Sequence, residues 1–213
     1  MCDRCVGRVE VTTVVGSRWS VEPQGRRRGP ELDSAILDAA LEQLSTVGWN
    51  GLTMEGVAAR ARTGKAAVYR RWPSKADLVA DVLRAGLPPL GEIPDHGSIR
   101  EELVVLCRGM RDAMTSRAGT ALRSVLHECD TVSADRFHEL IRTGFTEPSR
   151  RRFEDLVQRG IARGDVRSDA TGEFVADVIP AVMMYRSKVC GSEWGDQDIR
   201  EMIDQVLVPL LTS

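Results

Sequence analysis

From Glu31 onward, apolar side chains recur at helical spacing along almost the whole chain. The first stripe has a period near 3.6 and comprises Ile36, Leu37, Ala40, Leu41, Leu44 and Val47. It predicts a helix that ends at Gly48, because glycine readily takes the left-handed conformation of a helix cap. Thr53 is a good N-cap residue and predicts a second, short helix through Ala61.

A break at Arg62-Thr63-Gly64 separates this helix from a third one, expected to run to about Trp72. A fourth helix opens near Ser74, which stands at capping-box spacing from Asp77, and ends at Gly86. Two short helices joined by a tight turn are typical of a helix-turn-helix, whose second helix fits the major groove of DNA. We therefore expect a DNA-binding domain with its linking helix over residues 30–86.

The second half carries longer helical stripes, and we expect it to form one helical domain over residues 87–213. Ser98-x-x-Glu101 predicts a capping box at the start of a helix. Further helices are expected over 121–129, 134–145 and 148–163, followed by two apolar stripes over 174–183 and 199–210. Pro180 should kink the first of these last two. No long alternating run predicts a sheet, so the expected fold is all-α with about nine helices.

Composition adds a charge asymmetry and excludes several classes of protein. Of the 213 residues, the first 75 carry a net charge of +4 and the remainder −6, which suits a basic head on an acidic body. There is no apolar run long enough to span a membrane and no signal peptide pattern, so we expect a cytoplasmic protein. Nucleotide-binding loops and nucleophile motifs are missing and the three histidines are scattered, so no catalytic residue and no cofactor is predicted.

The five cysteines are odd in number and widely spaced, which argues against a disulfide framework. Cys2 and Cys5 have the spacing of half a zinc site, but no second half follows and no metal is expected. Cys107 falls in an apolar helical pattern and should be a small core residue.

Residues 1–29 are expected to form a flexible basic extension. Val9–Val15 could be a short strand, although an isolated strand is marginal. Arg26, Arg27 and Arg28 allow two interpretations: a solvated tail, or an arm that touches phosphates or the minor groove.

The segment Gly48 to Leu83, GWNGLTMEGVAARARTGKAAVYRRWPSKADLVADVL, closely resembles the TetR family of transcriptional regulators. The resemblance lies in the Gly-aromatic-x-Gly-Leu-Thr run, in Tyr-x-x-aromatic-Pro-Ser-Lys and in the apolar helix behind them. The turn and paired apolar helices after Arg159 also look like the regulatory half of this family. Two departures stand out: Arg62 replaces the usual glycine of the turn, and Gly64-Lys65-Ala66-Ala67 replaces a Ser-x-Gly-Thr pattern.

The resemblance implies a sequence-specific regulator, a repressor that binds a palindromic operator as a homodimer and releases it on binding a ligand. Tyr69 is expected at a phosphate by the resemblance, and Lys75 because an ammonium at a helix N-terminus suits one. Trp72 is assigned to packing. Besides the basic arm, the expected DNA-binding residues are Thr53, Arg62, Thr63, Gly64, Lys65, Ala66, Ala67, Tyr69, Arg70 and Lys75.

The resemblance also implies that residues 87–213 form a regulatory and dimerisation domain, which should hold an apolar or amphipathic small molecule of unknown identity and pair with a second subunit. Soft and aromatic side chains expected to line the ligand pocket are Met110, Met114, His127, Met183, Tyr185 and Trp194. The expected dimer interface comprises Val175, Val178, Val182, Ile199, Met202, Ile203, Val206 and Leu210, although these stripes also pack within the monomer. The alternative function is a helical small-molecule-binding protein without operator-specific DNA binding.

Overall fold

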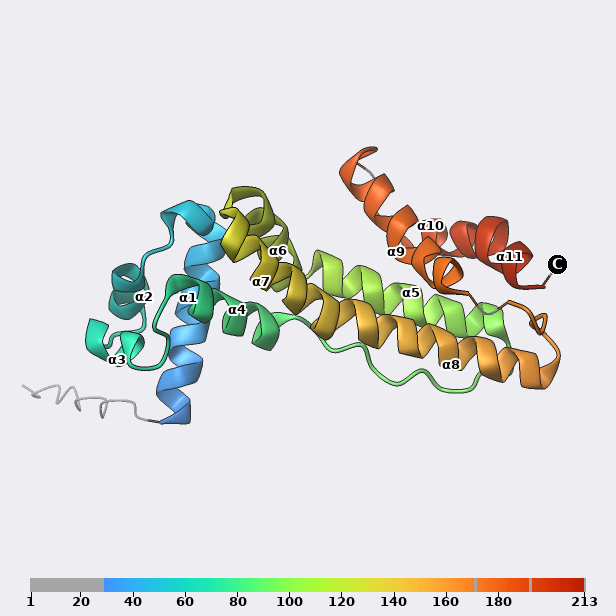
Figure 1. The fold of residues 1–213 in the computed structure, drawn as a ribbon, viewed down its shortest axis with the longest axis horizontal. Coiled ribbons are helices and arrows are strands. Elements are labelled where there is room, and N and C mark those ends of the chain that lie inside the picture. The colour runs from blue at the N-terminus through green and yellow to red at the C-terminus, as the bar shows by residue number, and fades with distance from the viewer. Residues whose placement is uncertain (1–28, 171, 192, 213) are drawn as a thin grey trace, which may run out of the picture.

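The computed structural model describes residues 29–170, 172–191 and 193–212, and over these residues the fold is all-α (Figure 1). The helices are α1 (Pro30–Gly51), α2 (Met54–Arg60), α3 (Lys65–Tyr69), α4 (Lys75–Gly86), α5 (Ile99–Thr115), α6 (Arg117–Glu128), α7 (Thr131–Ile141), η1 (Arg142–Thr146), α8 (Glu147–Arg163), α9 (Glu173–Lys188), α10 (Asp196–Met202), η2 (Ile203–Leu207) and α11 (Val208–Thr212). The two π-helical turns, η1 and η2, each join two α-helices without a break, so the described residues form nine continuous helical segments. This confirms the expected fold class and helix count.

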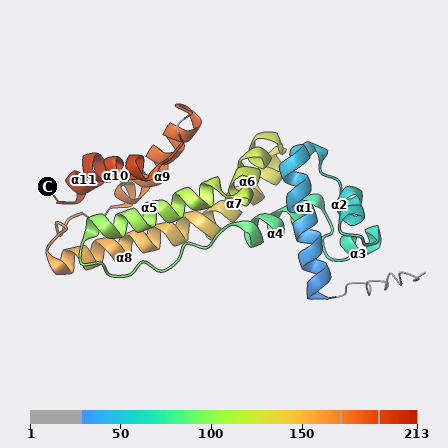
Figure 2. The same ribbon diagram turned by 180° about the vertical axis from the view of Figure 1, so that it is seen from behind.

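The molecule is elongated, with α1 to α3 at one end and α11 at the other (Figures 1 and 2). Two separate buried clusters hold it together. The first unites α1 to α4 with α6 and α7, and the second unites α5 and α8 with α9, α10, η2 and α11. The two buried clusters are therefore not separated at residue 86, the expected domain boundary. Helices α6 and α7 follow that residue in the chain but pack into the first cluster. That boundary stays a prediction.

An extended strap, residues 87–98, connects α4 to α5 and lies against α8 (Figure 1). Arginines of α8 fasten it: Arg152 donates to the Gly91 carbonyl at 2.8 Å, and Arg159 to the Ile93 carbonyl at 3.3 Å. Glu102 is fully buried behind the strap, where Arg159 and Arg163 approach its two carboxylate oxygens at 3.0 and 2.9 Å. Two ion pairs thus compensate for the burial of this carboxylate.

Several predicted caps are confirmed. Ser74 and Asp77 form the capping box of α4, and Gly164 ends α8 in the left-handed conformation with a φ of 87°. The Ser74 hydroxyl, and then Arg136, lower the pKa of Asp77 because both stabilise its carboxylate. Cys107 is fully buried, as predicted, and burial raises the pKa of its thiol to about 12.

Three expectations about helix ends are wrong. Ser98 makes no capping bond; the carboxylate of Asp165 instead accepts the N–H of Ile99 at 2.8 Å. The third helix ends at Tyr69 rather than near Trp72. The expected gap before Pro148 is also not there, because the wider π-helical turn lets the helix continue to a proline that offers no N–H.

The expected strand at Val9–Val15, the cysteine pair Cys2 and Cys5, and the basic arm Arg26 to Arg28 lie outside the described residues.

The corner between α1 and α2 is where the first cluster closes. Gly48 has a φ of 69° and a ψ of −173°, a combination available almost only to glycine. Glu128, at the end of α6, accepts the N–H of Asn50 at 3.1 Å, and its carboxylate lies 2.7 Å from where a side chain on Gly48 would begin. Trp49 is buried and meets the Phe137 ring edge-on, with 5.4 Å between ring centroids.

We expect Gly48→Ala to lower the free energy of unfolding by about 1–3 kcal/mol, since it combines backbone strain with a clash against Glu128. Chemical denaturation of the full chain measures this. Gly144→Ala is the matched control, because Gly144 has open space around it and no positive φ. Equal stability of the two variants would contradict the argument.

Candidate nucleic-acid interface

The short helix α2 is fixed at its start by two side chains. The Thr53 hydroxyl accepts the N–H of Gly56 at 3.1 Å, so Thr53 is the N-cap that the sequence predicts. Gln43 of α1 accepts the N–H of Thr53 at 3.2 Å. These bonds set the position of α2 against α1 and leave the Thr53 side chain at the surface.

The turn after α2 has the geometry of a Schellman motif. Arg62 takes a φ of 54°, the sole positive φ of a non-glycine residue among those described. Its N–H donates to the Ala59 carbonyl at 3.1 Å, and the N–H of Thr63 donates to the Ala58 carbonyl at 2.9 Å. Arg62 therefore occupies a position that favours glycine, and its exposed side chain projects from the turn.

Helix α3 has one face packed and one face open. Val68 is fully buried, and Arg71 is held by an ion pair with Asp33 of α1 and by the Ala67 carbonyl at 3.0 Å. Trp72, just after the helix, is buried and donates its indole N–H to Asp81 at 3.0 Å, which confirms its packing role.

The open face of α3 comprises Lys65, Ala66, Tyr69 and Arg70, all exposed, whereas Ala67 is half-buried. The hydroxyl of Tyr69 makes no hydrogen bond to any residue in the described part of the chain. The face lies at the end of the molecule farthest from α11 (Figure 2). It has the width of one helix and carries two cations and one phenol, a combination suited to base edges and phosphates.

Lys65 is already engaged in the free protein. Its ammonium pairs with Glu55 of α2 and lies 5.4 Å from the centre of the Tyr69 ring. The hydrogen bond between them lowers the pKa of Glu55 and raises that of Lys65. Both side chains are more than half exposed, so this ion pair is weak and breaks at little cost.

Lys75 turns toward the protein. Its ammonium donates to the Trp49 carbonyl at 2.7 Å and lies 4.3 Å from the centre of the Trp49 ring. Burial lowers the pKa of Lys75, against the opposing effect of Glu128. The contact uses one of three N–H donors, so the remaining two are available to a phosphate beside the start of α4.

Residues 36–82 match the family described as bacterial regulatory proteins, tetR family, and residues 93–206, more than half of the chain, match the tetracyclin repressor-like C-terminal domain. This chain belongs to the TetR family. It is therefore a ligand-responsive, DNA-binding transcriptional regulator, and the alternative without DNA binding is not supported.

Named relatives agree with this assignment. The uncharacterized HTH-type transcriptional regulator YdeS of Bacillus subtilis is 29% identical over 84% of this chain and 90% of its own length. The DNA-binding transcriptional repressor TetR of Mycobacteroides abscessus is 29% identical over 86% of this chain and 96% of its own. Among solved structures, the flavonoid-responsive regulator FrrA shares the fold with a TM-score of 0.66 at 19% identity, over 85% of this chain and 96% of that one.

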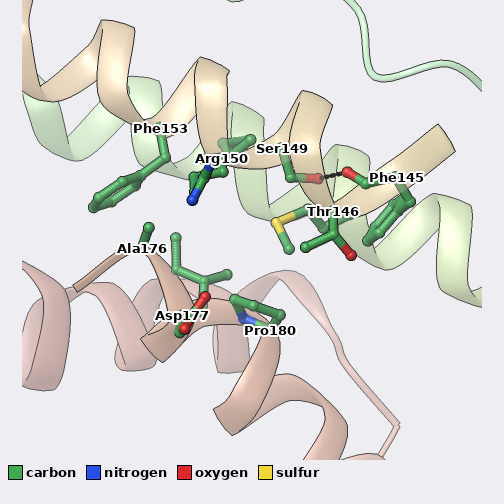
Figure 3. A pocket seen from close by; sticks show the side chains of 11 residues that line it. Phe145, Thr146, Ser149, Arg150, Phe153, Ala176, Asp177 and Pro180 are labelled. Atoms are coloured by element: carbon green, nitrogen blue, oxygen red, sulfur yellow. Dashed lines mark hydrogen bonds between the residues drawn. The ribbon is translucent and has the colours of Figure 1, made fainter. Parts of the chain in front are cut away.

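In the regulatory half of this TetR-family chain, a cavity of about 30 Å³ lies between α5, the η1–α8 segment and α9 (Figure 3). Its lining residues are Leu106, Met110, Phe145, Thr146, Ser149, Arg150, Phe153, Ala176, Asp177, Ile179 and Pro180. An open groove of about 550 Å³ lies next to it along α8 and shares Arg150, Phe153 and Ala176.

Of the six residues expected to line a pocket, the structure brings only Met110 to this cavity. Met183 and Trp194 are buried together instead, with the indole N–H donating to the Met183 carbonyl at 3.1 Å. His127 and Tyr185 are exposed, and Met114 is half-buried. Sequence reasoning missed Phe145 and Phe153, although their spacing of eight residues places them on one helix face.

The expected dimer residues also divide into two groups. Ile199, Met202 and Ile203 are buried within the chain, because α10 and η2 pack on α5. Val175, Val178, Val182 and Leu210 are half-buried, and Val206 is exposed. Four large apolar residues of this region that the sequence reading did not place at the interface are exposed: Phe174, Met184, Tyr185 and Val189.

We expect Arg62→Gly to raise the free energy of unfolding by about 1 kcal/mol, since glycine removes the strain of a positive φ at the Schellman position. Thermal and chemical unfolding measure the change. Arg60→Gly is the matched control: the same replacement inside helix α2, where φ is helical, should instead lower stability by about 1 kcal/mol. A loss of stability in both variants would contradict the role of the turn.

Proposed function

We propose that this TetR-family protein is a repressor that binds a roughly palindromic operator as a homodimer and releases it when a small apolar or amphipathic effector binds between α8 and α9. The observation that carries the proposal is the open face of α3, which is held rigidly from behind by Val68 and Arg71. A rigid, one-helix-wide face of this kind reads one major groove, and two such faces in a dimer read successive grooves about 34–36 Å apart.

The proposed DNA contacts fall into two groups. Lys65 and Arg70 contact base edges, together with Arg62, Thr63 and the small residues Gly64, Ala66 and Ala67. Thr53, Tyr69 and Lys75 contact phosphates from helix starts and from the exposed phenol, as does the arm Arg26 to Arg28. The small residues allow a close approach of α3 to the groove.

The proposed dimer uses the outward stripe of α9. Val178, Val182 and Tyr185 follow one helix face, and Val189 continues it just beyond the end of α9. Ile179 and Met183, on the neighbouring face, are buried in the monomer. An apolar stripe of this length on a soluble protein is best explained by a partner, and a second copy of the chain supplies the same stripe across a two-fold axis. Val206 and Leu210 extend the proposed surface onto η2 and α11.

The effector is proposed to be apolar or amphipathic because the cavity presents mainly aromatic and aliphatic side chains, whereas the neighbouring groove also carries Glu154, Asp155 and Gln158. The flavonoid-responsive regulator with the same fold is consistent with a ligand of this class. The two DNA-binding domains of a dimer can lie at different distances from each other. A ligand changes the population of these conformations only if it binds one of them more tightly than the other. The proposal includes no enzymatic activity.

Lys65→Met and Arg70→Met should each relax preference at particular base pairs, by roughly 1–3 kcal/mol. Tyr69→Phe and Lys75→Met should weaken binding to operator and random DNA equally, and Lys75→Met should also reduce the salt dependence by about one unit. Titration of fluorescent promoter fragments at several salt concentrations measures both effects. Unfolding measurements on Lys75→Met show how much of the loss comes from its contact with Trp49.

Glu55→Gln provides the control of opposite sign, since it frees Lys65 and removes a negative charge next to the DNA. It should tighten binding to random DNA by a few-fold at low salt. Identical behaviour of all these variants on operator and random DNA would overturn the assignment, as would a failure of the wild-type protein to bind any upstream fragment.

Tyr185→Glu should convert the protein from a dimer to a monomer, because a carboxylate buried in an apolar interface is strongly unfavourable. Sedimentation velocity over a range of concentrations measures the change. Val132→Glu is the matched control, since Val132 on α7 is 84% exposed and lies outside the proposed interface. A wild-type protein that sediments as a monomer, or an unchanged dimer in Tyr185→Glu, would refute this interface.

A further inference from the structure

The cavity between η1–α8 and α9 contains a backbone acceptor that its helix does not use. Pro180 lies inside α9 and has no N–H, so the carbonyl of Ala176, four residues earlier, lacks its usual helical donor. Ala176 and Pro180 both line the cavity (Figure 3). In a helix the carbonyl of residue 176 points along the axis toward residue 180, so this carbonyl belongs to the wall that the two residues form. An acceptor left in an apolar wall is costly until a donor reaches it.

The other polar groups near the cavity are largely occupied or facing solvent. The Ser149 hydroxyl donates to the Phe145 carbonyl at 2.7 Å, as Figure 3 shows. Arg150 is 3.6 Å from Glu154, and Asp177 is exposed on the opposite wall. Arg150 and Asp177 face each other across the opening, and the groove beside it adds the carboxylates of Glu154 and Asp155, so the site as a whole disfavours an anionic ligand.

We propose, building on the effector site above, that this site selects amphipathic, non-anionic ligands that carry a hydrogen-bond donor, and that the Ala176 carbonyl accepts this bond. The cavity of about 30 Å³ holds a group the size of a hydroxyl. The ligand's apolar body lies in the open groove between Phe153 and Ala176, which belong to both spaces. Pro180 is thus a specificity-determining residue that acts through the backbone.

Three probes of nearly equal shape separate the contributions. 2-Naphthol has a hydroxyl donor, 2-methoxynaphthalene has an acceptor only, and naphthalene has neither. Isothermal titration of the full-length protein without DNA should show 2-naphthol binding roughly 3- to 10-fold more tightly than the other two, the effect of one buried neutral hydrogen bond. Equal binding of 2-naphthol and 2-methoxynaphthalene would overturn the proposal.

Pro180→Ala is the decisive variant, because alanine restores the N–H that bonds the Ala176 carbonyl within the helix. The variant should fold, since alanine favours a helix interior far more than proline does. The preference for 2-naphthol over naphthalene should fall to about 1-fold in this variant. Pro209→Ala in α11 is the matched control and should keep the wild-type preference, because Pro209 lies outside both the cavity and the groove.

An unchanged preference in Pro180→Ala would refute the role of the carbonyl, even if all three affinities fell together. Binding of none of the probes up to their solubility limits would refute the ligand class. Release of promoter DNA is measured separately, so either failure leaves operator binding intact and stays distinguishable from a failure of the proposed function.

Discussion

The position of the DNA-binding head depends on how the corner between α1 and α2 is held. Gly48 turns the chain there in a conformation that other residues avoid. The carboxylate of Glu128 in α6 stabilises this turn by accepting the N–H of Asn50. Trp49 inserts between the Phe137 ring of α7 and the ammonium of Lys75. Helices α4, α6 and α7 therefore all contact the three consecutive residues 48–50. A change in any of these contacts would alter the orientation of α2 and α3.

This arrangement gives a physical path between the two halves of the molecule. Helices α6 and α7 belong to the cluster that contains the head, while η1 continues α7 directly into α8, one wall of the cavity. A displacement of α8 reaches Phe137 along one continuous helix, without crossing a flexible joint. Because packed interiors switch between discrete arrangements, we expect such a displacement to shift the corner between α1 and α2.

Much of the fold was predictable, because periodic apolar stripes and capping residues are local signals. The Thr53 cap, the Ser74–Asp77 box and the stripe of α1 follow from neighbouring residues and are confirmed, except that Val47 of the stripe is exposed. The misplaced features depend on distant partners: Asp165 replaces Ser98 as the cap of α5. Burial of Ile199 against α5 likewise could not be told from burial against a second chain, since one stripe serves either purpose.

The candidate site divides in the same way. The open face of α3 follows from helix spacing and turn chemistry, so most of its residues could be named from the sequence. The cavity lies between helices that are far apart in the chain. The side chains that face it depend on how α9 packs against α8, which the sequence alone does not specify. Pro180 was visible in the sequence as a helix-breaking residue, but the carbonyl that it leaves free becomes meaningful only beside an apolar opening.

The sharing of one buried cluster by α1 to α4 and by α6 and α7 limits how such a protein can be rearranged. A head cut away after Gly86 would lose a wall of its own interior, including Val125, Phe137 and Leu140, and would expose the apolar sides of α1 and α4. We therefore expect that α1 to α4 can be exchanged between relatives only if α6 and α7 are exchanged with them, or if α6 and α7 of the recipient fit the new surface. The buried surfaces of α1 and α4 on one side, and of α6 and α7 on the other, must therefore change together, whereas the exposed face of α3 can change independently of them.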